Sequence, residues 1–169
     1  MVANYICDQP YLWPTIFMNP SRSELTRQII ARARTLPRAL SEVEAEAAQR
    51  LDLHPSDVRA MIRLTGEPRA VGELAQAIGL SSPATSGVAD RLARRGLARR
   101  TSDPKDRRRS LVELTDAGRA ALEEALGPLH RDEEALLAGF TVPALETIRA
   151  YLAASEGLVD RHRRRLREG

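Results

Sequence analysis

Basic side chains crowd one short stretch of this 169-residue chain. Residues 81–110 hold nine lysines and arginines against three aspartates, a net charge of +6, whereas the whole chain carries only +3. The nine are Arg91, Arg94, Arg95, Arg99, Arg100, Lys105, Arg107, Arg108 and Arg109. Guanidinium and ammonium groups bind phosphate oxygens, and such a cluster is the electrostatic footprint of a protein that binds duplex DNA. A solvated, arginine-rich surface is the plainer alternative.

The secondary structure expected for this stretch favours DNA binding over a solvated charge run. The first half predicts a helix over residues 82–96, because Ser81 can serve as its N-cap and Pro83 fits the first turn. The second half predicts two short strands, residues 97–101 and 109–115, joined by a charged turn. A helix of this length spans about 22 Å and can lie along a major groove.

The helix offers two kinds of candidate contact to DNA. Small side chains in its N-terminal half can bond base edges or touch thymine methyl groups, and arginines in its C-terminal half are placed for phosphates. The candidates are Ser82, Pro83, Ala84, Thr85, Ser86, Ala89, Arg91, Arg94 and Arg95. One of these arginines could instead pair with Asp90.

The segment ELAQAIGLSSPATSGVADRLARRGLARRTSDPKDRRRSLVELTDAG, residues 73–118, resembles the winged helix-turn-helix of the MarR family of bacterial transcription regulators. Its DPKDRRR turn is similar to the family's wing signature, an aspartate-rich loop followed by paired arginines, and LTDAG is also typical. The resemblance implies a mainly α fold with a small β-wing. It also implies a homodimeric repressor that binds a pseudo-palindromic operator and is released by a small ligand.

The resemblance assigns roles in the wing and marks one departure on the helix. The basic wing residues expected to contact DNA are Lys105, Arg107, Arg108 and Arg109. Arginine side chains are favoured in a narrow minor groove. Asp103 and Asp106 are instead expected to orient a neighbouring arginine, because phosphates repel carboxylates. The family often carries an arginine or another side chain at the position of Gly87, so base discrimination here would depend more on DNA shape and on the wing.

The resemblance also divides the chain. Residues 23–169 are expected to form one MarR-like domain, with residues 56–115 as the winged helix-turn-helix core. Apolar residues recur every three or four positions in residues 23–50 and 116–169. In a monomer these flanking helices would have little core to share, and the resemblance implies that they instead interlock with the same helices of a second subunit. Four of the six aromatic residues fall in residues 1–22, which are expected to form an N-terminal arm; a flexible tail is the alternative.

Prolines predict interruptions in the long flanking helices. Pro37 should kink or split the first of them, and Gly127-Pro128 should bend or interrupt the helix that begins at residue 116.

Catalysis, metal binding and a cofactor are not expected. The three histidines, His54, His130 and His162, are far apart, and no metalloprotease, P-loop or nucleophile-elbow motif is present. Cys7 precedes the first helix, and the first two helices lack the tyrosines that accompany the sensing cysteine in one branch of the family. An incidental thiol is therefore expected, with a cysteine-based redox sensor as an alternative.

The cellular setting follows from absent signals. No apolar run approaches the roughly 20 residues that span a bilayer, and no signal peptide is visible, so a bacterial cytoplasmic, nucleoid-associated protein without membrane contact is expected.

The effector would be aromatic or lipophilic, in a pocket between the first, second and fifth helices that Tyr11, Trp13 or Phe17 could wall. A nucleoid-type protein without sequence preference is a second alternative.

Overall fold

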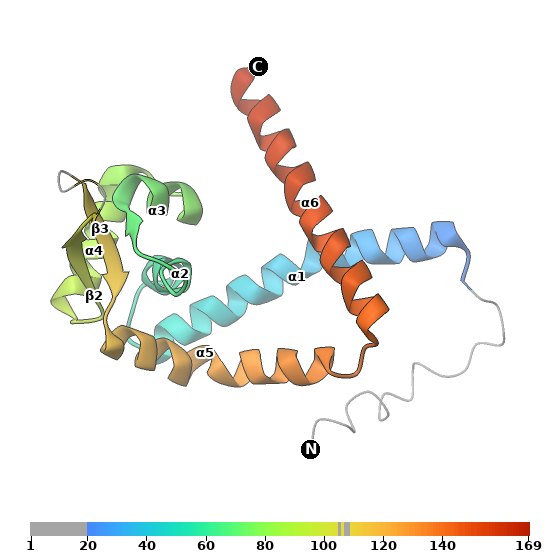
Figure 1. The fold of residues 1–169 in the computed structure, drawn as a ribbon, viewed down its shortest axis with the longest axis horizontal. Helices are drawn as coiled ribbons and strands as arrows, with labels where there is room; N and C mark the ends of the chain where they lie inside the picture. Colours follow the sequence, from blue (N-terminus) through green and yellow to red (C-terminus); the bar gives the residue numbers. More distant parts are fainter. Residues whose placement is uncertain (1–19, 105, 107–108) are drawn as a thin grey trace. The chain divides into compact units, whose positions relative to one another are not determined.

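The computed structural model describes residues 20–104, 106 and 109–169 (Figure 1). Its elements in chain order are α1 (Arg22–Arg50), α2 (Pro55–Arg63), β1 (Arg69–Ala70), α3 (Val71–Ile78), α4 (Ser82–Arg94), β2 (Ala98–Ser102), β3 (Ser110–Leu114), α5 (Asp116–Leu137) and α6 (Val142–Glu168). A mainly helical chain with one small antiparallel sheet confirms the predicted fold class. The arm expected over residues 1–22 lies almost wholly outside the described residues.

The helix-turn-helix is formed by α3, a short turn and α4, as the local sequence predicts. Gly79 ends α3 with a φ of 72°, a left-handed conformation that glycine adopts without steric cost. Ser81 is the N-cap of α4, since its side-chain oxygen accepts a hydrogen bond from the Ala84 N–H at 3.4 Å. The turn between the two helices is therefore fixed by its own residues.

The wing is the hairpin of β2 and β3, completed by the two-residue strand β1. The strand order is β1-β3-β2, with both pairs antiparallel. Arg100 lies opposite Val112 in one pair, and Ala70 lies opposite Leu111 in the other. The segment that leads into α3 is thus joined to the wing by backbone pairing.

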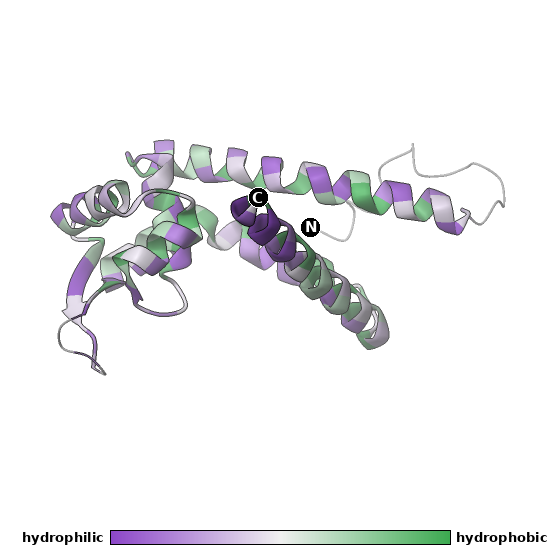
Figure 2. Ribbon diagram, turned by 90° about the horizontal axis from the view of Figure 1, so that it is seen from above, coloured by the Kyte–Doolittle hydropathy of each residue, from purple (hydrophilic) through white to green (hydrophobic). Residues whose placement is uncertain are grey.

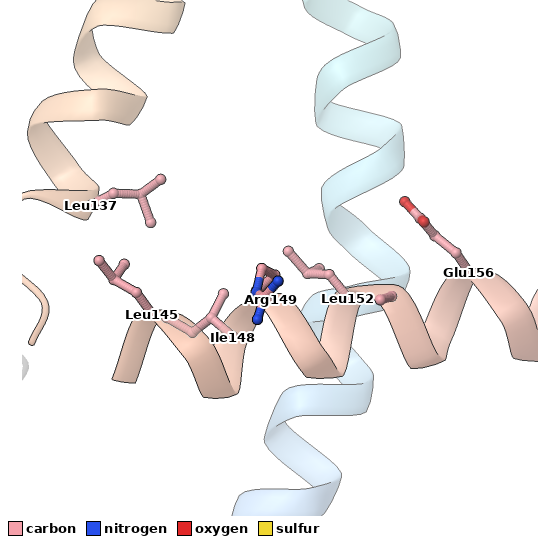
Figure 3. A pocket seen from close by; sticks show the side chains of 7 residues that line it. Leu137, Leu145, Ile148, Arg149, Leu152 and Glu156 are labelled. Atoms are coloured by element: carbon pink, nitrogen blue, oxygen red, sulfur yellow. The ribbon is translucent and has the colours of Figure 1, made fainter. Parts of the chain in front are cut away.

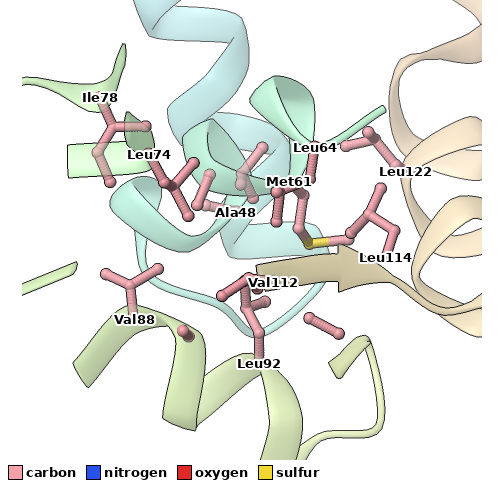
Figure 4. Packing of buried hydrophobic residues seen from close by; sticks show 14 of the residues in the cluster. Ala48, Met61, Leu64, Leu74, Ile78, Val88, Leu92, Val112, Leu114 and Leu122 are labelled. Atoms are coloured by element: carbon pink, nitrogen blue, oxygen red, sulfur yellow. The ribbon is translucent and has the colours of Figure 1, made fainter. Parts of the chain in front are cut away.

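The hydrophobic core gathers side chains from α2, α3, α4 and β3 (Figure 4). Burial of each large aliphatic side chain contributes about 1.5–3 kcal/mol relative to exposure. The largest apolar side chains with almost no exposure are Val58, Met61, Leu74, Val88, Leu92, Val112 and Leu114. Helix α1 contributes Ala47 and Ala48 at its C-terminal end, and α5 contributes Leu122 and Leu126 in its first half. Most of α1 therefore lies outside this core.

The chain divides after Pro128 into two compact units, the second of which includes Leu129–Gly169. Within that second unit α6 has no buried residue along its 27 positions. Its last turns are strongly hydrophilic, as Figure 2 shows by colour.

Neither proline divides its helix, so the predicted split at Pro37 and interruption at Pro128 are wrong, whereas the alternative predicted there, a kink or bend, stays a prediction. Pro37 lies inside the continuous helix α1, and Pro128 lies inside the continuous helix α5. Each proline removes one donor, for the carbonyl four residues earlier, but Ala33 and Glu124 are exposed, so water can replace the lost partner. One missing hydrogen bond in a long helix does not end it.

Gly118 joins the wing to α5 at a point where a side chain does not fit. Its N–H donates to the Thr115 hydroxyl at 3.1 Å, and that hydroxyl donates to the Gly96 carbonyl oxygen at 2.6 Å. A Cβ at Gly118 would overlap the carbonyl oxygen of Leu97, a backbone atom that accepts from the Thr115 N–H. Thr115 and Gly118 of the LTDAG segment thus bring the start of α5 into close contact with Gly96 and Leu97, just before β2.

The substitution Gly118→Ala should destabilise the protein by about 1–3 kcal/mol, because the clash is with backbone and cannot be relieved by a rotamer change. The matched control is Gly87→Ala, where a Cβ would meet only Arg91 Nη1 at 3.7 Å. That change should stabilise α4 by roughly 0.5–1 kcal/mol through helix propensity. Urea unfolding of both variants checks this, and an undiminished midpoint for Gly118→Ala would contradict it.

Candidate DNA-binding surface

One side of α4 faces the core. The buried residues of this helix are Thr85, Val88, Ala89 and Leu92. Thr85 has no exposed surface, and its hydroxyl donates to the Ser81 carbonyl oxygen at 3.0 Å; Ala89 is 1% exposed. The burial corrects the prediction that Thr85 and Ala89 are presented to DNA, since both occupy the helix face that packs on α2 and α3.

The opposite side of α4 faces solvent. Pro83, Gly87, Asp90 and Arg94 are spaced by four, three and four positions, which places them on one face of a helix. Ser82 and Ala84 in the first turn are also exposed. Among the described residues Arg94 has no ion-pair partner. This outward stripe carries one arginine and, at Gly87, no side chain.

Arg91 is held by a carboxylate of α2. Its Nη2 donates to Asp57 Oδ1 at 2.6 Å and its Nε to Asp57 Oδ2 at 3.2 Å, while Asp57 is only 2% exposed. The hydrogen bond that Arg91 donates to Asp57 raises the pKa of Arg91 further above its usual value. Asp57 also accepts from the backbone N–H of His54, the N-cap of α2. The ion pair therefore joins the start of α2 to the last turn of α4.

Arg95 is held by the turn between α1 and α2. Its Nη1 donates to the carbonyl oxygen of Asp52 at 2.8 Å and to the Asp52 carboxylate at 3.2 Å. Its Nη2 donates to the carbonyl oxygen of Leu51, the C-cap of α1, at 3.1 Å. Arg94 and these two arginines line a surface hollow of about 280 Å³.

Arg100 of β2 fastens the wing to α4. Its Nη2 donates to Asp90 Oδ1 at 2.9 Å and to Ser86 Oγ at 3.1 Å. A partner for Asp90 was expected from the helix itself, and the structure supplies it from the strand instead. Ser86, which is half-buried, shares this guanidinium with Asp90.

Arg109 stands at the base of the wing turn and faces two acids. Its Nη2 lies 2.6 Å from Glu73 Oε1 and its Nη1 lies 3.9 Å from Asp103 Oδ2. The hydrogen bond to Glu73 is the main cause of a raised pKa at Arg109, and it lowers the pKa of Glu73 in return. The Arg109 N–H donates to the carbonyl oxygen of Asp106 at 2.8 Å.

Intramolecular ion pairs thus engage most of the described cations in this cluster. Arg99 also pairs, with Glu113 at 2.6 Å across the β2–β3 hairpin. The paired residues are Arg91, Arg95, Arg99, Arg100 and Arg109. The wing residues Lys105, Arg107 and Arg108 lie outside the described residues.

Sequence reasoning missed the acids that hold these arginines. Asp57, Asp52 and Glu73 lie 34, 43 and 36 residues from their partners along the chain. Only the tertiary packing brings them together, so no local pattern could have identified them.

Within the described residues, no group of three potential ligands could hold a metal ion, and none of the helices there is sufficiently long and apolar for a bilayer. Cys7 lies outside them.

Comparisons with known proteins agree with this geometry. The model of the MarR family matches residues 51–109. The Bacillus subtilis protein YcgE, described as an uncharacterized HTH-type transcriptional regulator, is 30% identical over 149 residues, which cover 88% of this chain and 97% of YcgE. The chain therefore belongs to the MarR family of transcriptional regulators, and it is not an enzyme.

Two solved structures show the same fold. The transcriptional regulator BldR from Sulfolobus solfataricus has a TM-score of 0.55 and 26% identity, covering 79% of this chain and 99% of BldR. The transcriptional repressor CouR, solved bound to a 23-mer DNA duplex, has a TM-score of 0.53 and 26% identity, covering 82% of this chain and 99% of CouR.

The substitution Asp57→Asn should destabilise the protein by about 1–3 kcal/mol, because the change leaves Arg91 without its buried anionic partner. The Arg91 side chain is 42% exposed, which keeps this cost below that of a fully buried pair. Asp52→Asn is the matched control, since Asp52 is almost fully exposed and should cost less than about 0.5 kcal/mol. Chemical denaturation measures both, and equal midpoints would refute the role given to Asp57.

Proposed function

We propose that this regulator binds a pseudo-palindromic DNA operator as a homodimer and acts as a repressor that a small ligand releases. The observation that supports DNA binding is the outward stripe of α4, on the helix that follows the α3–α4 turn. Its Pro83, Asp90 and Arg94 are exposed, and Arg94 has no ion-pair partner in the described part of the chain. Membership of the MarR family and the CouR structure on DNA support it.

The proposed contacts follow from the exposure of each side chain and from the partners it already has within the protein. Ser82, Pro83 and Ala84 are exposed in the first turn of α4 and are assigned to base edges, and Arg94 is assigned to a phosphate. The wing would add Lys105, Arg107 and Arg108, whose basic side chains suit a narrow minor groove. Asp103 and Asp106 would orient the wing turn, since both contact Arg109. Arg91 and Arg95 would act by fixing α4.

Unburied apolar side chains support the homodimer. A single copy leaves them facing water, and contiguous apolar surface of this kind marks a contact with another molecule. On α1 the exposed ones are Leu25, Ile29, Ile30, Leu36 and Leu40, and on α6 they include Tyr151, Leu152, Leu158 and Val159. In the second unit, the end of α5 and the start of α6 form an apolar groove of about 370 Å³ (Figure 3). A second copy related by two-fold symmetry would cover these faces.

The ligand and the setting are proposed by analogy with the family. An aromatic or lipophilic effector would bind beside the helix-turn-helix and release the operator. The regulator would act on nucleoid DNA in the bacterial cytoplasm.

The substitution Leu152→Asp should convert the dimer into a monomer or an aggregate, because it places a charge in the apolar groove. Ala150→Asp is the matched control, since residue 150 is exposed and lies on the opposite face of α6 from residue 152. Sedimentation velocity at micromolar concentration measures both variants. A wild-type protein that sediments as a well-folded monomer would contradict the dimer.

Competition separates sequence-specific from non-specific binding. A labelled duplex from the region upstream of the chain's own gene is challenged with unlabelled copies of itself and with random DNA of the same length. A regulator should prefer its own region by orders of magnitude, whereas a nucleoid-type protein should show equal competition.

Arg94→Ala should weaken binding of this duplex and make the slope of log affinity against log salt shallower by about two, because a dimer loses two phosphate contacts. Arg164→Ala is the control, since Arg164 is exposed in the second unit, outside the helix-turn-helix and wing. Titrations at several salt concentrations, with circular dichroism to confirm folding, give the slope. An unchanged slope for Arg94→Ala would remove Arg94 from the DNA surface.

A further inference from the structure

We propose that Glu73 and Arg109 form a bridge that positions the wing turn, and that Arg109 contributes to operator binding through this bridge rather than by touching DNA. The inference rests on the proposed DNA-binding function and replaces the direct contact that the sequence suggested for Arg109. Glu73 and Arg109 are then positioning residues. The wing cations proposed to reach DNA are Lys105, Arg107 and Arg108.

Arg109 is engaged at both its backbone and its side chain. Its N–H donates to the carbonyl oxygen of Asp106 at 2.8 Å, and its carbonyl oxygen accepts from the N–H of Asp103 at 3.0 Å. Its guanidinium lies between two acids from different segments, 2.6 Å from Glu73 on α3 and 3.9 Å from Asp103 before the turn. One residue therefore closes the wing turn and ties that turn to α3.

Glu73 is itself fixed at the start of α3. Its Oε2 accepts from the N–H of Ala70 at 3.1 Å, the hydrogen bond that caps α3, while its Oε1 faces Arg109. Ala70 belongs to β1 and pairs with Leu111 of β3. The carboxylate thus connects the sheet, the first helix of the helix-turn-helix and the wing turn.

The negative charge of Glu73 is unexpected on a surface proposed to bind DNA phosphates. Hydrogen bonds from Arg109 and from the Ala70 N–H lower the pKa of Glu73, so it is ionised at neutral pH. A carboxylate on this surface repels DNA and would weaken binding if it had no other role. Its removal therefore separates the two readings of Arg109 by the sign of the effect.

The test variant is Glu73→Gln. Glutamine at this position keeps the cap of α3 but removes the charge that holds Arg109. The bridge predicts binding of the upstream duplex weaker by about two- to fivefold, the range that exposed ion pairs contribute. If Arg109 binds DNA directly, the loss of a negative charge and the release of Arg109 should strengthen binding instead.

Hydrogen exchange gives a second readout that needs no DNA. The Glu73→Gln change should speed amide exchange across residues 102–110. The matched control is Glu67→Gln, which removes the same charge from a neighbouring pair, that of the exposed Glu67 with the half-buried Arg69 at 3.3 Å. This control should bind DNA at least as tightly as wild type and leave exchange in the wing unchanged.

A double variant tests whether the two residues act together. Arg109→Gln should weaken binding, and Glu73→Gln combined with Arg109→Gln should be no weaker than Arg109→Gln alone, because both changes remove one bridge. An additive loss would mean that Arg109 acts independently and would overturn the inference.

The outcomes separate this inference from the proposed function. Equal or tighter binding by Glu73→Gln, or unchanged exchange in its wing, overturns the bridge and leaves the proposed function intact. A wild-type protein that shows no preference for the upstream duplex defeats the proposed function, and the exchange measurement alone then decides whether the bridge exists.

Discussion

The orientation of α4 depends on a carboxylate that has almost no contact with water. Asp57 is 2% exposed and its one cationic partner among the described residues is Arg91, so any movement of α4 away from α2 would strand a buried charge. A pair of this kind adds little net stability over an apolar packing, but breaking it is costly. Its effect is therefore to select one position of the helix. Arg95 reinforces that position from the α1–α2 turn.

The same arrangement changes how the basic cluster should be understood. A count of charges along residues 81–110 suggests nine groups available to phosphates, yet acids elsewhere on the fold engage Arg91, Arg95 and Arg109. Part of the basic cluster therefore stabilises the fold, because these arginines form ion pairs with acids on other elements. Among the described residues, fewer of these cations lack an acidic partner than the count along the sequence implies.

Local features of the fold were predictable because their causes are local. The Ser81 cap, the turn at Gly79 and the hairpin follow from residues within a few positions of one another. The partners of the arginines were not, since they lie tens of residues away and meet only in the folded core. Thr85 and Ala89 were misplaced for a different reason: they are small or polar, so the buried stripe they share with Val88 and Leu92 was not recognised.

Gly87 has an evolutionary consequence. It lies in the middle of the outward stripe of α4, and a Cβ there would meet only Arg91 Nη1 at 3.7 Å. A larger residue could therefore appear at this position without disturbing the core, and under the proposed function it would lie on the helix face turned toward DNA. The neighbouring ion pairs would keep the helix in place while such a residue altered which DNA sequences are preferred. A lineage could in this way acquire new target genes through one codon, with its stability preserved.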